Sequence, residues 1–392
     1  MRHAPLVSLI ALSVWALGHP SAYAHGGPPA TYDVLLSSGD VSLVTSHGFF
    51  ADDMGWAWIC DEATDADIAA STTRTSSRWF VGTLYGLKTS VDGCQWLDDP
   101  GLIDTHILRV MADSQDPERV WVVTMDGLWT VDGLDDARLE WSAEFSLRHA
   151  GQRADGGLLL VGFDGPSPVA QLGAQRIPLP AETGRIEVMS ADTSGRFYLR
   201  FPAGMTDRLV RVSEVGAEVL IARTDLIRDV ASLGDALYVL TDAGVSWSDD
   251  DGAHWAPPIG PPMTCLREGA LGVYACPPKG SGAALWYAPV LEPDPTTWSW
   301  ESALDFASVA PQTCALGSTV RNICPLIWPI VSEELGILPE GPSDATLTAP
   351  IEASGCGVGG SGRQGRKVLW VLVILLSLCQ LSLGHWSSGM KP

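Results

Sequence analysis

Apolar and polar positions recur along the chain in one repeating unit, which is clearest at residues 237–255. The run 237–242 alternates in a way that predicts a strand with both faces covered. Gly244 follows at a position where a side chain would obstruct the backbone, and 245–247 predict the returning strand. The unit therefore indicates a β-hairpin, and weaker copies of it predict the architecture of most of the chain.

The hairpin unit returns with a nearly constant spacing. The glycines that close the first turn of six successive copies are Gly48, Gly86, Gly127, Gly165, Gly204 and Gly244. They lie 38, 41, 38, 39 and 40 residues apart, and a seventh copy follows at 273–282. Unrelated hairpins or a β-sandwich would not keep one period over seven units, whereas a period near 40 is typical of propeller blades. We predict an all-β fold, a seven-bladed β-propeller over residues 25–330.

The apolar runs also predict where each blade begins. The runs start near residues 41, 79, 120, 158, 197, 237 and 273. Residues 31–37 are strand-like and stand before the first of these runs. A propeller often closes its ring with a strand from the opposite end of the chain, so we expect 31–37 to complete the last blade.

A polar turn follows the hairpin in several copies. At 248–255 it has the pattern S-x-D-x-G-x-x-W, in which Asp caps its own backbone, Gly takes a positive φ and Trp folds over the turn. Residues 51–58 fit with Ala in the Ser place, 89–96 fit with Asp displaced by one position, and 130–141 look like a copy with an insertion. The turn residues predicted for this motif are Asp53, Gly55, Trp58, Gly93, Trp96, Ser248, Asp250, Gly252 and Trp255.

These turns resemble the Asp-box of sialidase-like (BNR) repeats, the Vps10/sortilin ectodomain and the photosystem II assembly factor. The resemblance covers roughly residues 41–310 and implies a propeller fold. It does not imply sialidase activity, because Asp-boxes lie on the periphery of the blades, far from the axial site where such enzymes work. One fold hosts many unrelated functions.

Composition and charge narrow the class of partner. The 392 residues are 46% hydrophobic and 18% charged, with 41 Gly and 27 Pro, which suits many short strands and tight turns. The formal net charge of −22 argues against nucleic acid, because nucleic-acid binders present basic faces. The sequence contains no phosphate-binding loop, nucleophilic Ser elbow or zinc motif, so we predict neither cofactor nor metal.

The two ends of the chain predict export and anchoring. Residues 1–24 have a basic start, a short apolar core and a small-x-small cleavage site, which indicate a signal peptide. Residues 331–362 form a Pro-, Ser- and Thr-bearing linker. Residues 363–392 hold a basic flank, an apolar run that predicts a transmembrane helix, and a short tail. Cys356, in a Gly-Cys-Gly cluster, resembles the processing point of the sorting tails of myxobacterial surface proteins.

Six cysteines lie in the predicted propeller, and export would allow them to form disulfides. They are Cys60, Cys94, Cys265, Cys276, Cys314 and Cys324. Two pairs flank turns, and the remaining two cysteines follow similar positions in adjacent repeats. Proximity in the sequence therefore favours three pairs, which are Cys60–Cys94, Cys265–Cys276 and Cys314–Cys324.

An enzyme and a binding protein are both compatible with such a propeller. Sialidases share an Arg-Ile-Pro motif, present here at 176–178, and three arginines that clamp a carboxylate. The candidates Arg200, Arg208 and Arg211 are close in sequence, whereas the clamp draws its arginines from separate blades. The motif also stands in the middle of the repeats rather than in the first blade. A glycoside hydrolase of sialidase type is therefore the alternative, and not the preferred interpretation.

We predict a non-catalytic, monomeric binding or scaffolding protein at the cell envelope, tethered to the membrane by its C-terminal helix. A purely structural surface component is the second alternative. The expected partner is an envelope or extracellular protein or glycan, presented to loops on a stiff frame. Aromatic side chains near the turns either contact this partner or pack between blades; they are Phe49, Phe50, Trp56, Tyr85 and Trp129.

Overall fold

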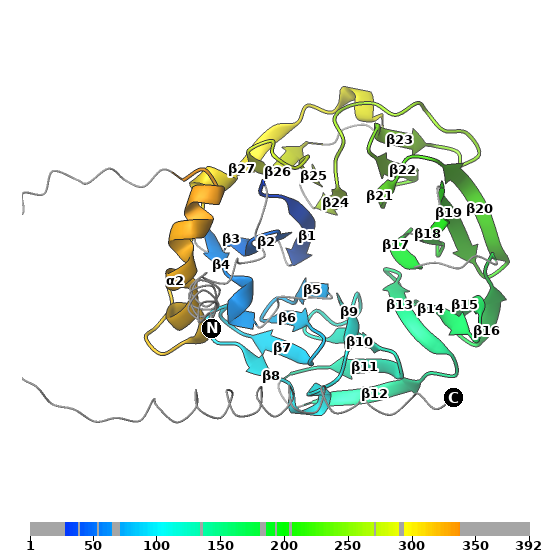
Figure 1. Ribbon diagram of the computed structural model, residues 1–392. Helices are drawn as coiled ribbons and strands as arrows, with labels where there is room; N and C mark the ends of the chain where they lie inside the picture. The colour runs from blue at the N-terminus through cyan, green and yellow to red at the C-terminus, as the bar shows by residue number, and fades with distance from the viewer. Residues whose placement is uncertain are drawn as a thin grey trace, which may run out of the picture. The chain divides into compact units, whose positions relative to one another are not determined.

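The protein is described here by a computed structural model, which divides into two compact units, Met1–Pro339 and Glu340–Pro392. The described residues all belong to the first unit. They are 28–37, 40–52, 55–64, 71–133, 136–180, 186–192, 194–203, 206–269, 272–289 and 294–337. This unit is a ring of seven β-sheets arranged as blades around one axis (Figure 1).

Each blade is built from consecutive strands that run antiparallel from the centre of the ring outward. Blade 1 contains β1 (Thr31–Ser37), β2 (Asp40–Thr45), β3 (Gly48–Asp52) and β4 (Trp56–Ile59). Blade 2 contains β5 (Ser71–Arg74), β6 (Trp79–Gly82), β7 (Leu87–Ser90) and β8 (Leu97–Asp98). Blade 3 contains β9 (Ile107–Ala112), β10 (Val120–Thr124), β11 (Gly127–Val131) and β12 (Ala137–Ser142). Blades 4 and 5 contain β13 (Ser146–Gln152), β14 (Leu158–Asp164), β15 (Ser167–Leu172) and β16 (Gln175–Pro178); and β17 (Glu187–Ala191), β18 (Phe197–Ala203), β19 (Thr206–Ser213) and β20 (Gly216–Arg223).

Blades 6 and 7 complete the ring. They contain β21 (Ile227–Leu233), β22 (Ala236–Thr241) and β23 (Gly244–Ser248); and β24 (Cys265–Gly269), β25 (Gly272–Cys276), β26 (Ala283–Ala288) and β27 (Glu301–Asp305). A short strand, β28 (Ala310–Pro311), and a helix, α2 (Thr319–Glu334), follow them. In the connections that the structure describes there are four 3-10 turns: η1 (Asp61–Thr64), η2 (Pro100–Leu102), η3 (Pro295–Thr297) and η4 (Phe306–Ser308). Apolar side chains fill the space between neighbouring blades, as the buried Leu199 and Val210 do beside blade 4.

The turn between the second and third strands is built alike in four blades. In each, a threonine hydroxyl donates to the carbonyl oxygen of the glycine three residues later, at 2.9 to 3.2 Å. Gly244 has a φ of +119°, and a Cβ there would lie 2.5 Å from the carbonyl oxygen of Ile259. The glycine spacing read from the sequence is therefore the spacing of this hairpin from blade to blade, and the prediction of seven blades is confirmed.

The predicted role of residues 31–37 as a closing strand for the last blade is wrong. These residues form β1, which pairs with β2 and is the innermost strand of blade 1. The apolar runs that we took for the beginnings of blades are their second strands. Because the repeat was out of phase by one strand, β1 looked like a strand left over. The ring must therefore close by other means.

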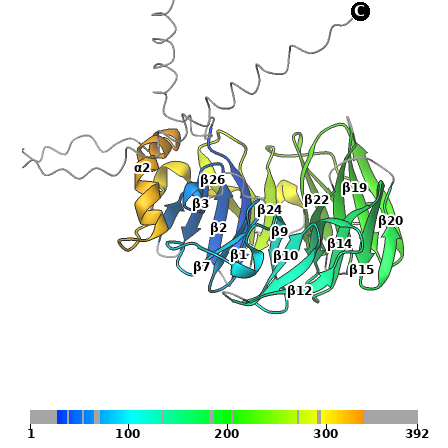
Figure 2. The same ribbon diagram turned by 60° about the horizontal axis from the view of Figure 1, so that its bottom comes forward.

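Closure is made by residues 310–337, which we call the C-terminal clasp. Its strand β28 adds in parallel to β4 at the outer edge of blade 1, and α2 follows along the same edge (Figures 1 and 2). Nε2 of the buried His47 lies 2.7 Å from Oε2 of Glu334 on α2. The rings of Trp58 and Trp328 lie 5.1 Å apart. The clasp therefore covers β4, which would otherwise be the exposed outer strand of blade 1.

Two disulfides fasten the clasp to the first two blades. The three bonds are Cys60–Cys324, Cys94–Cys314 and Cys265–Cys276. The last pair, which joins neighbouring strands of blade 7, confirms the prediction from sequence proximity. The other two predicted pairs are wrong, because the clasp returns past the closure of the ring and brings its cysteines beside residues more than 200 positions earlier.

The helix α2 was not apparent in the sequence because two prolines interrupt it. Pro325 and Pro329 each remove a backbone donor, but both lie on the exposed side, while Ile327 and Val331 are buried against blade 1. Ser318 caps the first turn by accepting a hydrogen bond from the backbone of residue 321. The helix continues to Glu334, so the packed part of the chain extends beyond residue 330, where we had placed its end.

Several predictions fall on parts of the chain outside the described residues. The signal peptide at 1–24, Cys356 and the transmembrane helix within 363–392 are among them. Within the described ranges, no helix has the length and apolar character that crossing a membrane requires.

Candidate functional site

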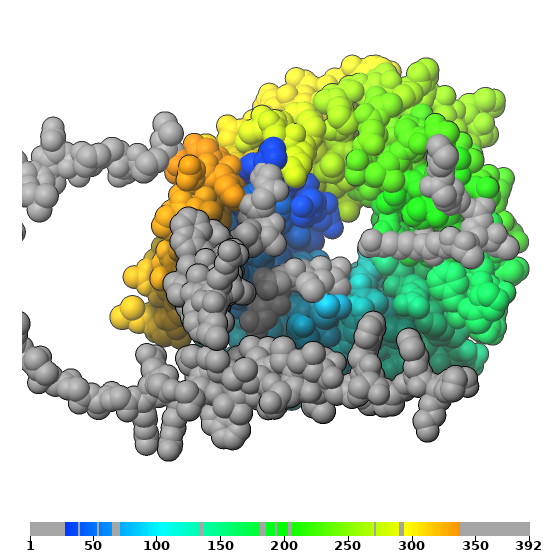
Figure 3. All heavy atoms as spheres, in the orientation of Figure 1, coloured from blue at the N-terminus to red at the C-terminus, as the bar shows by residue number. Residues whose placement is uncertain are grey.

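A central channel is the candidate functional site. The innermost strands of the seven blades surround it, and Figure 3 shows it as a hollow in the middle of the ring. A cavity of about 910 Å³ lies where these strands begin, and a second of about 380 Å³ continues toward their ends. The two share Asp33, Arg109 and Arg267 among their lining residues. We call the larger cavity the channel mouth; its size is that of a small-molecule site.

A bulge at the same place in five innermost strands shapes the channel mouth. In β1, β9, β13, β17 and β21 one residue near the start of the strand has no partner in the register. A bulge re-aims the side chains around it, so such a blade can present two successive residues to the channel. All five bulged residues line the mouth; they are Tyr32, Leu108, Arg148, Met189 and Arg228.

One side of the channel carries an arginine that is fully compensated. Arg267 on β24 forms an ion pair with Asp229 on β21 and another with Asp33 on β1, the latter at 2.7 Å. Asp229 also accepts hydrogen bonds from the backbone of Val230 and Leu266. Burial alone would lower the pKa of Arg267, but the two carboxylates raise it above its ordinary value. This cluster joins blades 6, 7 and 1.

The other side carries an arginine of the opposite kind. Arg109 on β9 contacts the ring of His149 on β13 and donates to the carbonyl oxygen of Val188 at 3.0 Å. No carboxylate of a described residue lies within ion-pair distance of it. Burial lowers the pKa of Arg109 to about 10, in spite of the more distant negative charges of Asp33, Asp229 and Glu187. A partly buried cation without a paired anion costs stability, so this guanidinium is available to bind one.

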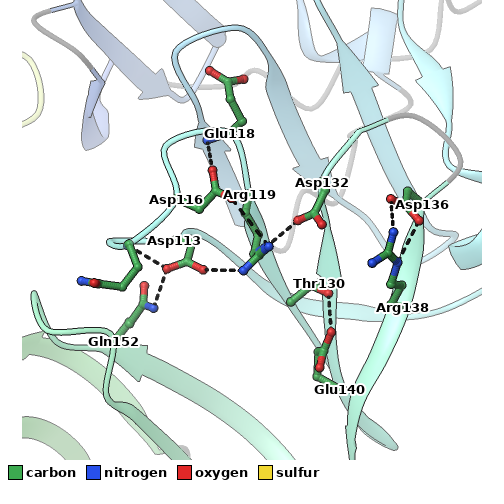
Figure 4. A network of polar contacts seen from close by, with 11 residues as sticks. Asp113, Asp116, Glu118, Arg119, Thr130, Asp132, Asp136, Arg138, Glu140 and Gln152 are labelled. Atoms are coloured by element: carbon green, nitrogen blue, oxygen red, sulfur yellow. Dashed lines mark hydrogen bonds and ion pairs between the residues drawn. The ribbon is translucent and has the colours of Figure 1, made fainter.

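Arg119, in the same blade as Arg109, shows what full compensation looks like. Its guanidinium lies 2.6 Å from Asp132, 3.6 Å from Asp116 and 3.8 Å from Asp113 (Figure 4). The hydrogen bond that Arg119 donates to Asp132, and the charges of all three carboxylates, raise the pKa of Arg119. Blade 3 thus surrounds Arg119 with three carboxylates, whereas Arg109 in the channel has no ion pair with a described residue.

The channel mouth is more cationic than the chain as a whole. Four arginines and two histidines line it against three carboxylates, in a chain with a net charge of −22. Of the carboxylates, Asp33 and Asp229 bind Arg267, and Glu187 binds Arg200 at 3.1 Å. Arg148 is exposed to the mouth and makes no hydrogen bond or ion pair with any described residue.

The turn residues predicted from the sequence lie on the outer rim, away from the channel. In the turn at 248–255, Ser248 Oγ lies 2.8 Å from Asp250, Asp250 accepts from the backbone of His254, and the indole of Trp255 donates to Gly252 at 2.9 Å. The turn at 90–96 is one residue shorter and has corresponding bonds. Ser90 donates to Asp92, Asp92 accepts from the backbone of Gln95, and the indole of Trp96 donates to Gly93 at 3.2 Å. The two turns therefore share one design despite the displaced Asp.

The first turn differs from these two. The indole of Trp58 donates to the carbonyl oxygen of His47 in the neighbouring hairpin, not to Gly55. Asp53 lies outside the described residues. Trp58 therefore belongs to the packing of blade 1 against the C-terminal clasp.

The residues considered for a sialidase do not meet in the channel. Arg176 lies on β16, the outermost strand of blade 4, and is 3.5 Å from Asp164. Arg200 and Arg211 bind carboxylates of their own blade, Glu187 and Glu218. The aromatic candidates divide as well: Phe49 and Phe50 are buried in the core, whereas Tyr85 is 69% exposed.

Sequence reasoning missed the channel residues, although a signal for them exists. Asp33, Arg109, His149 and Asp229 each follow a bulge, and they lie 76, 40 and 80 residues apart, which are multiples of the blade period. Once the phase of the repeat is known, equal positions in different blades must converge on the axis. Among the described residues, no group of three His, Cys, Asp or Glu could hold a metal ion.

Comparison with known proteins identifies the fold. No family model and no curated protein matches the sequence. The extracellular domain of a protein described as a hybrid two-component system from B. thetaiotaomicron aligns with a TM-score of 0.51 and 11% identity, over 68% of this chain and 39% of that one. The GH74 xyloglucanase from Xanthomonas campestris aligns with a TM-score of 0.48 and 14% identity, over 70% of this chain and 54% of that one. YCF48 bound to a D1 peptide aligns with a TM-score of 0.46 and 12% identity, over 65% of this chain and 91% of that one. At 11% identity, the alignment with the two-component-system domain shows a likeness of fold alone.

Proposed function

We propose that the chain is an exported, membrane-tethered β-propeller that acts as a non-catalytic binding protein, with the channel mouth as its ligand site. The observation that carries this proposal is the state of Arg109. A rigid ring holds its guanidinium in place through His149 and Val188, and leaves it without a carboxylate. Because a partly buried charge without an ion pair costs stability, a site of this kind is better explained by a ligand than by the fold.

Export and the identity of the rim turns belong to the same proposal. Three disulfides support an oxidising compartment, as the predicted signal peptide does. The apolar run within 363–392 would hold the protein in a membrane, so we expect its release to require detergent. The shared hydrogen bonds of the turns at 90–96 and 248–255 support their assignment as Asp-boxes. The proposed partner is an envelope or extracellular protein, with a glycan as the alternative.

Site-specific crosslinking in the cell envelope tests the binding function. A photo-reactive amino acid replaces Tyr32, which is 59% exposed and lines the channel mouth, in the full exported chain. The matched control carries it at Val215, which is 98% exposed in the turn between two outer strands of blade 5. We expect a defined adduct from position 32 and not from position 215. Adducts from neither position would overturn the binding function, and turnover of a fluorogenic sialoside that Arg176→Ala abolishes would then favour the glycoside hydrolase.

A further inference from the structure

The chemistry of the channel mouth narrows its ligand to one class. We infer that the ligand carries a carboxylate attached to an apolar group, and that Arg109 and Arg148 bind the carboxylate. This inference rests on the proposed function, since it names the ligand of the same site. It depends on two observations: which cations in the mouth are free to pair with a ligand, and which side chains stand next to them.

The free cations lie on one side of the mouth. Arg228 pairs with Asp242 at 2.8 Å, and Arg267 is held between two carboxylates. Arg109 and Arg148 have no ion pair with any described residue, and they come from β9 and β13 of adjacent blades. Guanidinium groups bind carboxylates through paired charge-assisted hydrogen bonds. An incoming carboxylate would therefore find two unpaired arginines on blades 3 and 4, and none on blades 6 and 7.

Apolar side chains stand beside these arginines. The bulged residues of blades 3, 4 and 5 are Leu108, Arg148 and Met189, so Arg148 stands between two apolar side chains at the same level of the channel. Phe163 and the buried Ile186 line the same side of the cavity. A small hydrophilic anion would leave this surface exposed to water. A carboxylate with an apolar group next to it would cover the surface and bury its charge against the arginines.

Two sources present such a group, a free amphiphilic acid and the carboxyl end of a polypeptide. Titration calorimetry with the full chain compares N-acetyl-leucine with N-acetyl-leucinamide, which differs only in its uncharged end. We expect the acid to bind at least about tenfold more tightly than the amide. Acetyl-Gly-Ala-Leu then separates the sources: tighter binding than that of N-acetyl-leucine assigns the polypeptide end, and equal binding assigns the free acid.

Matched variants locate the binding. Because Arg148 is exposed and has no ion pair with a described residue, the Arg148→Gln variant should fold normally. We expect its affinity for N-acetyl-leucine to be at least about tenfold lower than that of the wild type. Arg138→Gln removes the same charge from the outer strand of blade 3, where Arg138 is 62% exposed and paired with Asp136, and should leave binding unchanged. Arg109→Met is the second test variant and should also weaken binding.

Three outcomes would overturn this inference: equal affinity for the acid and the amide, equal affinity for acetate and N-acetyl-leucine, or unchanged binding in both Arg148→Gln and Arg109→Met. The inference would also be overturned if neither N-acetyl-leucine nor acetyl-Gly-Ala-Leu bound. If position 32 still crosslinks to a defined partner in that case, the ligand class is wrong and the binding function stands. If position 32 gives no adduct either, the binding function fails with it.

Discussion

The outer rim of blade 1 and the channel mouth beside blades 3 and 4 differ in how their polar groups are paired. At the rim, His47 is bound to Glu334, the indole of Trp58 has a carbonyl acceptor, and a disulfide joins the two elements. At the mouth, Arg109 and Arg148 have no counter-ion among the described residues. Complete pairing is what a structural region needs, whereas missing partners in a rigid frame indicate a place for a ligand.

The largest expected effect comes from removing the disulfide that holds the C-terminal clasp to blade 1. Replacing Cys60 and Cys324 together by Ser removes a bond between residues 264 positions apart. The remaining Cys94–Cys314 bond shortens the closed loop to about 45 residues, for which the chain-entropy description of disulfides gives a loss of about 4 kcal/mol in the free energy of unfolding. The control is the pair Cys265 and Cys276, only 11 positions apart, for which the same description gives about 3 kcal/mol. Denaturant unfolding measures both, and an equal loss from the two pairs would show that the clasp does not restrain the ring.

A second prediction compares two arginines within the channel. Arg267→Met should lower the free energy of unfolding by about 3 kcal/mol, because it leaves Asp33 and Asp229 as unpaired charges. Arg109→Met should change it by less than about 1 kcal/mol in either direction, since no carboxylate loses its partner. Equal destabilisation by both variants in urea unfolding would mean that Arg109 supports the fold as Arg267 does. The two sides of the channel would then not differ in how their arginines are compensated.

These comparisons also show which features the sequence can reveal. The period near 40 was visible because the threonine and glycine of each second hairpin, such as Thr241 and Gly244, satisfy a local backbone requirement. The rim turns were visible for the same reason: Ser248, Asp250 and Trp255 bond within eight residues. Local chemistry leaves a local pattern.

Features made by closing the ring leave no such pattern. Nothing near Cys60 indicates that Cys324 will lie beside it, and the two prolines of α2 hid the helix that brings it there. The channel depends on residues such as Asp33, Arg109 and Arg267, which belong to separate blades and meet only after the whole ring has formed. Assigning the second strands as the first also concealed that β1 is innermost and that Asp33 faces the axis.

A third prediction concerns the two equivalent rim turns. Trp255→Phe and Trp96→Phe each remove an indole hydrogen bond to a glycine carbonyl and keep an aromatic ring. Each should lower the free energy of unfolding by about 1 kcal/mol, the value of one neutral hydrogen bond. The control is Trp56→Phe, because the Trp56 indole donates to no described residue, and thermal unfolding compares the three. A loss in Trp56→Phe as large as in the other two would show that ring size, not the hydrogen bond, matters at the rim.

The smallest predicted effect is a pH dependence of stability that we expect at the rim turn and not in the channel. Hydrogen bonds from the side chain and backbone of His254 lower the pKa of Asp250 to about 2, below the value of 3.8 for a free Asp. A depressed acid pKa means that the carboxylate stabilises the fold above about pH 4, and that this contribution is lost as the pH falls through about 2. The gap in unfolding temperature between the wild type and Asp250→Asn should therefore narrow from pH 6 to pH 2.

Asp249→Asn is the control for this effect, because Asp249 makes no hydrogen bond with a described residue; its unfolding temperature should follow that of the wild type. Arg109 provides the contrast in the channel. Its pKa of about 10 keeps it charged throughout this range, so the gap between the wild type and Arg109→Met should not change with pH on its account. A gap for Asp250→Asn that stays constant down to pH 2 would mean that the carboxylate is not held as its hydrogen bonds indicate. The rim turn would then share with the channel mouth a charge that the fold leaves uncompensated.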